Sequence, residues 1–257
     1  MADNKKMAEY LESCSVPESN LIENLCSSSR AFNDFYSNER KKIKSPITWQ
    51  HNKKLRPEDQ ILSGELAEMR ISTNGDVCII IHNYPAKEND ASTITHELAH
   101  AIMKEEGYPF IGHYRGCSDP EVIHLCKQFN EMIHDPLILK KILLNYDFNL
   151  QNEYSKDCAD GITALIKENK SGIERIRVTF FFTQLLLEQD LIFENETNPC
   201  FEYIQKLGEE YSDIMDKSNA IYKMIKTLGI DSPEQVGDII KTVIEMHHGL
   251  SDIVEIY

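Results

Sequence analysis

The sequence predicts an α+β protein in which one β-hairpin is followed mostly by helices. Apolar and polar residues alternate over 68–73, an apolar run covers 76–82, and Asn74-Gly75 between them is a favoured two-residue hairpin turn. Elsewhere apolar residues recur at helical spacing, and several of these stretches begin with residues that cap helices. We expect an N-terminal helical segment over 1–45 and a single domain over 46–257.

The first helix after the hairpin is expected over about 90–106. Asn89 or Asp90 can serve as its N-cap, because both side chains accept hydrogen bonds from the first free backbone N–H groups. Apolar residues follow at positions i, i+4, i+7 and i+8, and Gly107 offers a C-terminal stop. This stretch is therefore predicted to be an amphipathic helix.

A second helix is expected over about 119–135. Asp119 is a candidate N-cap, Pro120 suits the first helical position, and Pro136 is expected to end this helix or to open another. The remainder, 136–257, is predicted to be predominantly helical. Its expected helices cover 136–144, 173–191, 201–227 and a last stretch that begins with the capping-box pattern of 232–235.

Composition and charge exclude several classes of function. The 257 residues include 27 basic and 42 acidic side chains, which gives a formal charge of −15. Non-specific binding to nucleic acid or anionic membranes usually needs a basic surface. No apolar stretch is long enough for a transmembrane helix, the first residues lack the apolar core of a signal peptide, and the cysteines form no Cys-x-x-Cys pair. We expect a cytoplasmic protein with no nucleic-acid or membrane partner; its oligomeric state stays open.

One motif carries chemistry, and it lies inside the helix expected over 90–106. The stretch His96-Glu97-Leu98-Ala99-His100 places two histidines at positions i and i+4. Such residues lie on one helix face, about 6 Å apart along the axis, so both imidazoles can reach one metal ion. Glu97 stands beside them, where it can deprotonate a metal-bound water, whose pKa zinc lowers from about 15.7 to about 7.

With this motif the sequence resembles the zincin metallopeptidases, mainly over 76–135. The resemblance implies a zincin-like fold, one Zn²⁺ ion per chain, and two ligands in His96 and His100. It also implies hydrolysis of a peptide or protein substrate with Glu97 as the catalytic base. In zincins the strand before the motif helix is typically an edge strand that holds the substrate, and Val77–His82 is the matching segment.

The third protein ligand of the metal is left open by the sequence. A catalytic zinc site needs three such ligands and one position for water. Residues 130–135 resemble the N-E-x-x-x-D element of thermolysin-type gluzincins, which implies Glu131 as the ligand and Asp135 as the residue that orients a ligating histidine. The alternative is His113, whose spacing is similar to that in the SprT-like repair metalloproteases. His134 is a further candidate.

Peptide hydrolysis also needs a hydrogen-bond donor for the oxyanion that forms during attack. In gluzincins this donor is a His or Tyr that follows the third ligand. The candidates here are Tyr154, Tyr203, Tyr211, Tyr222, His247 and His248. The sequence thus favours a gluzincin-type zinc metallopeptidase. Two alternatives stay open, namely a dedicated protease that cleaves one intracellular partner and a non-catalytic, metal-stabilised binding module.

Overall fold

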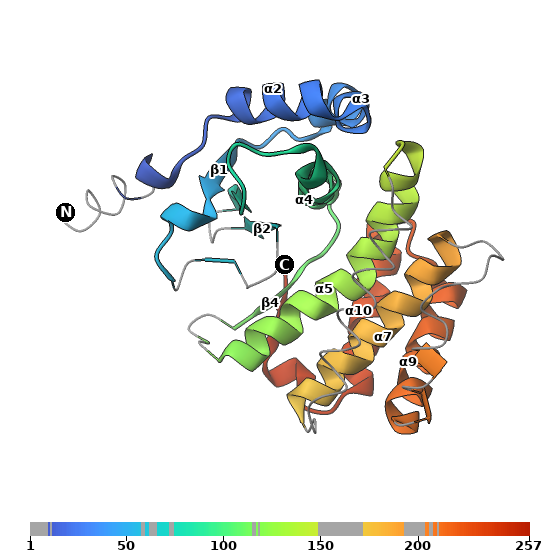
Figure 1. The fold of residues 1–257 in the computed structure, drawn as a ribbon. Coiled ribbons are helices and arrows are strands. Elements are labelled where there is room, and N and C mark those ends of the chain that lie inside the picture. Colours follow the sequence, from blue (N-terminus) through green and yellow to red (C-terminus); the bar gives the residue numbers. More distant parts are fainter. Residues whose placement is uncertain are drawn as a thin grey trace. The chain divides into compact units, whose positions relative to one another are not determined.

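A computed structural model of the chain describes residues 10, 12–57, 60–61, 66–71, 75–114, 117, 119–148, 172–192, 204–205, 208–209 and 211–257. The predicted α+β class is confirmed, because helices dominate the described chain and its strands form one three-stranded and one two-stranded sheet (Figure 1). The chain divides into two compact units. The first comprises 1–106 with 142–148, and the second comprises 107–141 with 149–257.

The first unit combines a small sheet with helices. Its α-helices and strands are α2 (Glu18–Ser28), α3 (Arg30–Glu39), β1 (Ile47–His51), β2 (Ala67–Ile71), β3 (Val77–Ile81) and α4 (Ala91–Glu105). Short 3₁₀ turns are η1 (Arg40–Lys42), η2 (Asn52–Lys54), η4 (Glu88–Asp90) and η5 (Leu143–Asn145). The helical character expected for the N-terminal segment is thus found in α2 and α3.

The predicted antiparallel pairing of the two hairpin strands is confirmed, but Ile71 lies opposite Val77, a register that does not fit a two-residue turn at Asn74-Gly75. The second strand also has a different place in the sheet from the one expected. β2 pairs antiparallel to β3, and β1, which the sequence analysis missed, pairs parallel to β3 on the other side. The sheet order is therefore β1-β3-β2, and the expectation that Val77–His82 forms an edge strand is wrong. An unbroken apolar run such as this is typical of a strand enclosed by neighbours. β2, the first strand of the hairpin, is therefore an edge strand of this sheet.

The second unit contains a group of helices and a two-stranded sheet. Its elements are β4 (Ile111–His113), α5 (Pro120–Lys141), α7 (Ile173–Ile192), α9 (Ser212–Leu228), α10 (Pro233–Met246), the 3₁₀ turn η6 (Leu250–Asp252) and β5 (Val254–Ile256). α7 packs against both α5 and α9, α9 also contacts α10, and β4 pairs antiparallel with β5 (Figure 1). The expected helices at 173–191 and from 233 onward are confirmed. Of the helix expected over 201–227, only the part from Ser212 onward is observed, as α9; Tyr211 before it is not helical, so the expected start is wrong. Residues 201–203, 206–207 and 210 lie outside the described residues.

α5 continues through Pro136, so the helix boundary expected there is wrong. Proline has no N–H to donate to the carbonyl of Met132, which costs about 3 kcal/mol in a helix interior. The next residues, Leu137, Ile138 and Leu139, are buried. Burial of one such side chain contributes about 1.5–3 kcal/mol, so the packing of this last turn outweighs the lost hydrogen bond.

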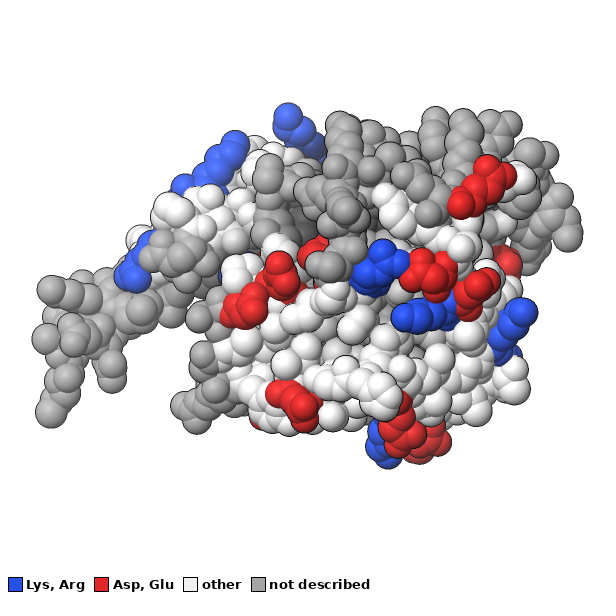
Figure 2. Space-filling model, turned by 90° about the horizontal axis from the view of Figure 1, so that it is seen from below, with Lys and Arg blue, Asp and Glu red and all other residues white. Residues whose placement is uncertain are grey.

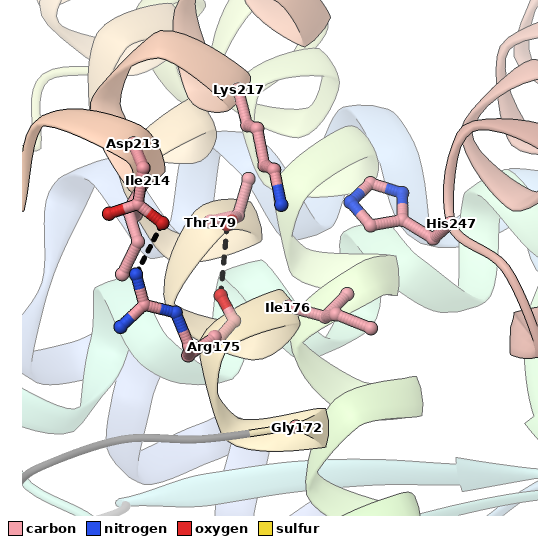
Figure 3. Close-up of a pocket in the computed structure, with 8 residues that line it drawn as sticks. All are labelled: Gly172, Arg175, Ile176, Thr179, Asp213, Ile214, Lys217 and His247. Carbon is pink, nitrogen blue, oxygen red and sulfur yellow. Dashed lines mark hydrogen bonds and ion pairs between the residues drawn. The ribbon is translucent and has the colours of Figure 1, made fainter.

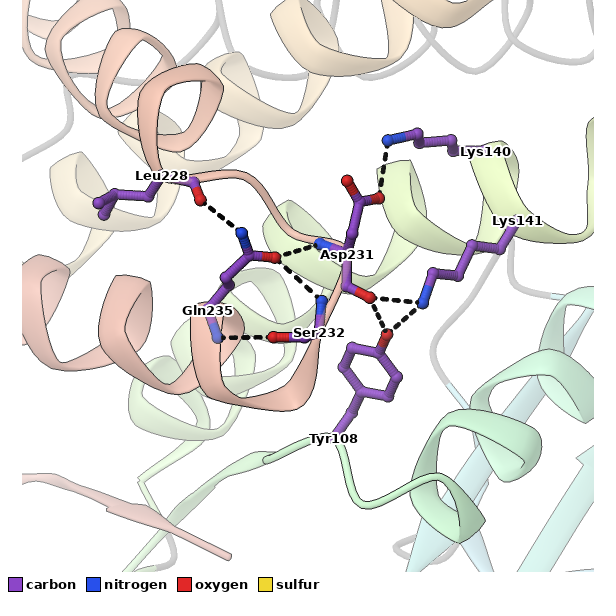
Figure 4. Close-up of polar contacts among 7 residues, drawn as sticks. All are labelled: Tyr108, Lys140, Lys141, Leu228, Asp231, Ser232 and Gln235. Carbon is purple, nitrogen blue, oxygen red and sulfur yellow. Dashed lines mark hydrogen bonds and ion pairs between the residues drawn. The ribbon is translucent and has the colours of Figure 1, made fainter.

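The junction between α9 and α10 is held by polar contacts within the second unit (Figure 4). Ser232 accepts a hydrogen bond from the Gln235 N–H (3.3 Å), and the Gln235 side chain accepts one from the Ser232 N–H (3.1 Å), which completes the predicted capping box. The Asp231 carbonyl accepts hydrogen bonds from the Tyr108 hydroxyl (3.0 Å) and the Lys141 ammonium (2.9 Å). These contacts fix the start of α10 against the end of α5.

Two expectations from composition have structural counterparts among the described residues. No helix there is long and apolar enough to cross a bilayer. The cysteines that the structure describes are free thiols, namely Cys14, Cys26, Cys78, Cys117 and Cys126.

Candidate metal centre

The motif lies on α4, which begins and ends where the sequence analysis expects. Asp90 is the N-cap residue of α4, but its side chain makes no capping hydrogen bond to that helix. Its carboxylate instead accepts hydrogen bonds from the Lys87 N–H (2.7 Å) and the Asn83 side-chain amide (2.8 Å). Gly107, with φ +84°, follows the helix in the left-handed conformation that suits glycine at a helix end. Leu98 is fully buried between the two ends, so packing fixes which face of α4 carries the motif.

His96 and His100 face each other across one turn of α4. Their Nε2 atoms lie 3.0 Å apart, and their ring centroids are 4.7 Å apart at an interplanar angle of 81°. Two imidazole nitrogens on a tetrahedral zinc ion, with bonds of about 2.05 Å, are about 3.4 Å apart. The observed spacing differs from this value by only a few tenths of an ångström, so the pair fits one metal ion after a small side-chain rotation.

Glu97 is tied to the edge strand of the sheet. Its carboxylate is buried and its Oε2 accepts a hydrogen bond from the Met69 N–H of β2 at 2.6 Å. Within the described part of the chain β2 pairs with β3 alone, so this outward-facing N–H is not used by the sheet. The interaction leaves Oε1 of Glu97 available for other chemistry.

The acidic candidates lie on α5, in the second unit. Asp135 and Glu131 are four residues apart and therefore share one helix face. Oδ2 of Asp135 accepts a hydrogen bond from the Gln184 side-chain amide (3.1 Å), and Oε1 of Glu131 lies 3.8 Å from the Lys127 ammonium. Both carboxylates therefore have polar neighbours within their own unit.

His96 and His100 of the first unit, and Asp135 of the second, have side chains that could hold a metal ion. The sequence analysis assigned Asp135 to orienting a histidine rather than to binding the metal. Ligation by Glu131 stays a prediction. The imidazole and carboxylate donor set suits zinc, although it also suits other divalent transition metals.

The other candidate ligands have defined places in the second unit. His113 ends β4, is half-buried, and its Nδ1 lies 3.2 Å from the Tyr114 carbonyl oxygen. His134 is fully buried, its Nε2 lies 3.0 Å from the Pro109 carbonyl oxygen, and its ring meets that of Phe110 at 4.4 Å between centroids. These contacts give His134 a packing role in the core of that unit.

The structure places some of the candidate oxyanion donors. The Tyr222 hydroxyl donates to Oδ2 of Asp190 at 2.5 Å, and burial together with this carboxylate raises the pKa of Tyr222 to about 12. His247 is buried at the end of α10, with its Nδ1 3.0 Å from the Val243 carbonyl oxygen. Tyr154 and Tyr203 lie outside the described residues. No donor is assigned among the candidates.

Two polar contacts at the site are absent from the sequence analysis, namely Met69 with Glu97 and Gln184 with Asp135. The partners are separated by 28 and 49 residues, respectively. Neither contact can be predicted from residue spacing in the sequence, because each depends on which strand or helix packs beside the functional element. The contact between Met69 and Glu97 could have been predicted only if β2 had been recognised as an edge strand.

Charged side chains of both signs are interspersed over the face in Figure 2, without an extended basic patch among the residues described there. Comparisons with known proteins give no further guidance: no family model, no curated protein and no solved structure matches the chain.

Proposed function

We propose that the protein is a zinc-dependent metallopeptidase. The observation that carries the proposal is the arrangement on α4, where the Nε2 atoms of His96 and His100 lie 3.0 Å apart. Glu97, between them in sequence, is buried beside an edge strand. A purely structural metal site has no need of a carboxylate at this position, whereas hydrolysis needs a base beside the water.

In the proposed reaction each residue has a distinct task. His96 and His100, with a carboxylate of α5 (Asp135 or Glu131), would hold one zinc ion per chain. Zinc, when bound, supplies the Lewis acidity that makes water reactive near neutral pH. Glu97 would take a proton from the attacking water through Oε1 and return it to the amine nitrogen of the leaving peptide. The Met69 N–H would hold Oε2 in place during both transfers.

The test begins with the base. Glu97→Gln should retain zinc, measured by mass spectrometry on protein purified without added metal, and should lose at least about 100-fold in cleavage of unstructured casein. Glu106→Gln is the matched control, because this exposed glutamate follows the same helix and should leave both quantities unchanged. Cleavage by Glu97→Gln at the wild-type rate would contradict the assigned role of the base.

The metal ligands require a second set of variants. Wild-type protein should carry about one zinc per chain, and His96→Ala should carry none. Loss of zinc in Asp135→Ala but not in Glu131→Ala would identify Asp135 as the third ligand, and the opposite result would identify Glu131. A wild-type protein that binds no zinc even after reconstitution would overturn the proposal.

A further inference from the structure

A second candidate site lies entirely within the second unit and shares no residue with the motif of α4. A cavity of about 140 Å³ is bounded by the start of α7, the start of α9 and the residue that follows α10 (Figure 3). One water molecule needs only about 10–15 Å³ of such a cavity, so there is room for a small ligand. The polar side chains that line it belong to Arg175, Thr179, Asp213, Lys217 and His247.

His247 presents a hydrogen-bond acceptor to this cavity. The side chain is only 8% exposed, and its Nδ1 lies 3.0 Å from the Val243 carbonyl oxygen. A carbonyl can only accept, so Nδ1 carries the proton and Nε2 of the neutral ring is an acceptor. Burial, with a smaller contribution from the charge of Lys217, lowers the pKa of His247, which keeps the ring neutral at pH 7.

The acceptor has no partner within the described part of the chain. No hydrogen bond to Nε2 of His247 is present there, and Figure 3 shows this side of the ring turned toward Lys217 and the cavity. Nε2 is reached from the cavity, so a molecule bound there can pair with it. A ligand in the cavity should therefore include a hydrogen-bond donor for Nε2.

The cavity also carries one uncompensated positive charge. The guanidinium of Arg175 and the carboxylate of Asp213 form an ion pair on one side of it, so these two charges offset each other (Figure 3). Lys217 forms no ion pair with any described residue. A ligand should therefore be an anion that can also donate one hydrogen bond.

We propose that this cavity binds a phosphate group, free or as a monoester, that still carries one proton. Its unprotonated oxygens would accept hydrogen bonds from the Lys217 ammonium. Its P–O–H group would donate to Nε2 of His247. Sulfate has the same shape but carries no proton at neutral pH, so it would place a lone pair against the imidazole lone pair.

The contrast between phosphate and sulfate is the test. Calorimetric titration at pH 7 and constant ionic strength should show inorganic phosphate binding at least about tenfold more tightly than sulfate, since one hydrogen bond to a charged group contributes about 1.5–3 kcal/mol. The ¹⁵N resonance of His247 Nε2 should shift with phosphate and not with sulfate. Equal affinity for the two anions, or no binding of phosphate at millimolar concentration, would overturn the proposal.

Variants separate the contributions of the two side chains. Lys217→Met should weaken phosphate binding at least about tenfold. Lys223→Met, an exposed lysine on the same helix, should leave binding unchanged, and equal weakening in both variants would refute the site. His247→Phe keeps a ring against Phe180 but removes the acceptor, so phosphate and sulfate should then bind equally weakly.

The source of the phosphate group is decided by a second titration. Glycerol 3-phosphate that binds more tightly than inorganic phosphate would indicate a monoester ligand, and weaker binding would indicate the free anion. The assay involves neither zinc nor Glu97, so its outcome is independent of the proposed peptidase activity.

Discussion

Replacement of His134 by alanine distinguishes a core residue from a metal ligand. This histidine lies in the middle of α5, directly before Asp135, and was a candidate for the third ligand. It is fully buried, its Nε2 lies 3.0 Å from the Pro109 carbonyl oxygen, and its ring packs on Phe110. His134→Ala should therefore destabilise the second unit without removing zinc.

The expected loss of stability follows from these contacts. Leaving the Pro109 carbonyl oxygen without its donor costs about 1–3 kcal/mol. Loss of the ring pair with Phe110 adds about 0.5–1.5 kcal/mol. The total, about 3 kcal/mol, matches the lower end of the range for truncating a buried aromatic side chain to alanine. Since 1.4 kcal/mol corresponds to a factor of ten, the population of opened α5 should rise by about 100-fold.

Amide hydrogen exchange of α5 peptides, followed by mass spectrometry, measures this population locally. Exchange should be about 100-fold faster in His134→Ala than in wild type, with zinc still near one per chain. His124→Ala, a half-buried histidine on the same helix, should change the opening free energy by less than about 1 kcal/mol. Unchanged exchange together with loss of zinc would refute the reasoning and make His134 a metal ligand.

Two further predictions concern stability. Burial, and then the hydrogen bond to Glu18, raises the pKa of Tyr36 from 10.0 to about 12, so the folded protein keeps this proton where the unfolded chain has lost it. The resulting stabilisation is complete below pH 10 and disappears as the pH rises to about 12; urea unfolding of Tyr36→Phe should therefore show a shallower alkaline loss. Pro136→Ala should stabilise the protein by about 1 kcal/mol in the same assay, because it recovers about 3 kcal/mol of helix propensity and loses two buried methylene groups worth about 1.6 kcal/mol; a lower urea midpoint would contradict this balance.

The features predicted correctly are those that depend on neighbours in sequence. The capping box at Ser232 follows from side-chain chemistry within one helical turn. The antiparallel pairing of β2 with β3 follows from the alternation of apolar and polar residues, although its register is not that of the predicted two-residue turn. β1 escaped prediction because its parallel partner β3 lies about 30 residues away, at Val77 for Ile47. Parallel strands are joined by a long connection and not by a tight turn, so no local turn motif in the sequence predicts their pairing.

The site divides in the same way between local and long-range information. The i, i+4 spacing alone predicts that His96 and His100 share a face, and the 3.0 Å separation of their nitrogens confirms it. The third ligand is different, because Glu131 and Asp135 are also four residues apart on one face of α5. Helical periodicity brings both carboxylates to one face, so it does not identify which of them is the metal ligand. Their different neighbours, Lys127 for Glu131 and Gln184 for Asp135, are what distinguish them chemically.

The hydrogen bond from Met69 to Glu97 bears directly on the proposed chemistry. A carboxylate that rotates freely must be oriented at each turnover, whereas a backbone N–H that holds Oε2 at 2.6 Å fixes the direction of Oε1 in advance. The donor belongs to the main chain of β2, so no side-chain substitution short of proline removes it. The edge position of β2 is what leaves this N–H available, because the corresponding groups of a central strand are consumed by its neighbours. The edge position of β2 in the order β1-β3-β2 therefore supplies the proposed base with its main-chain donor.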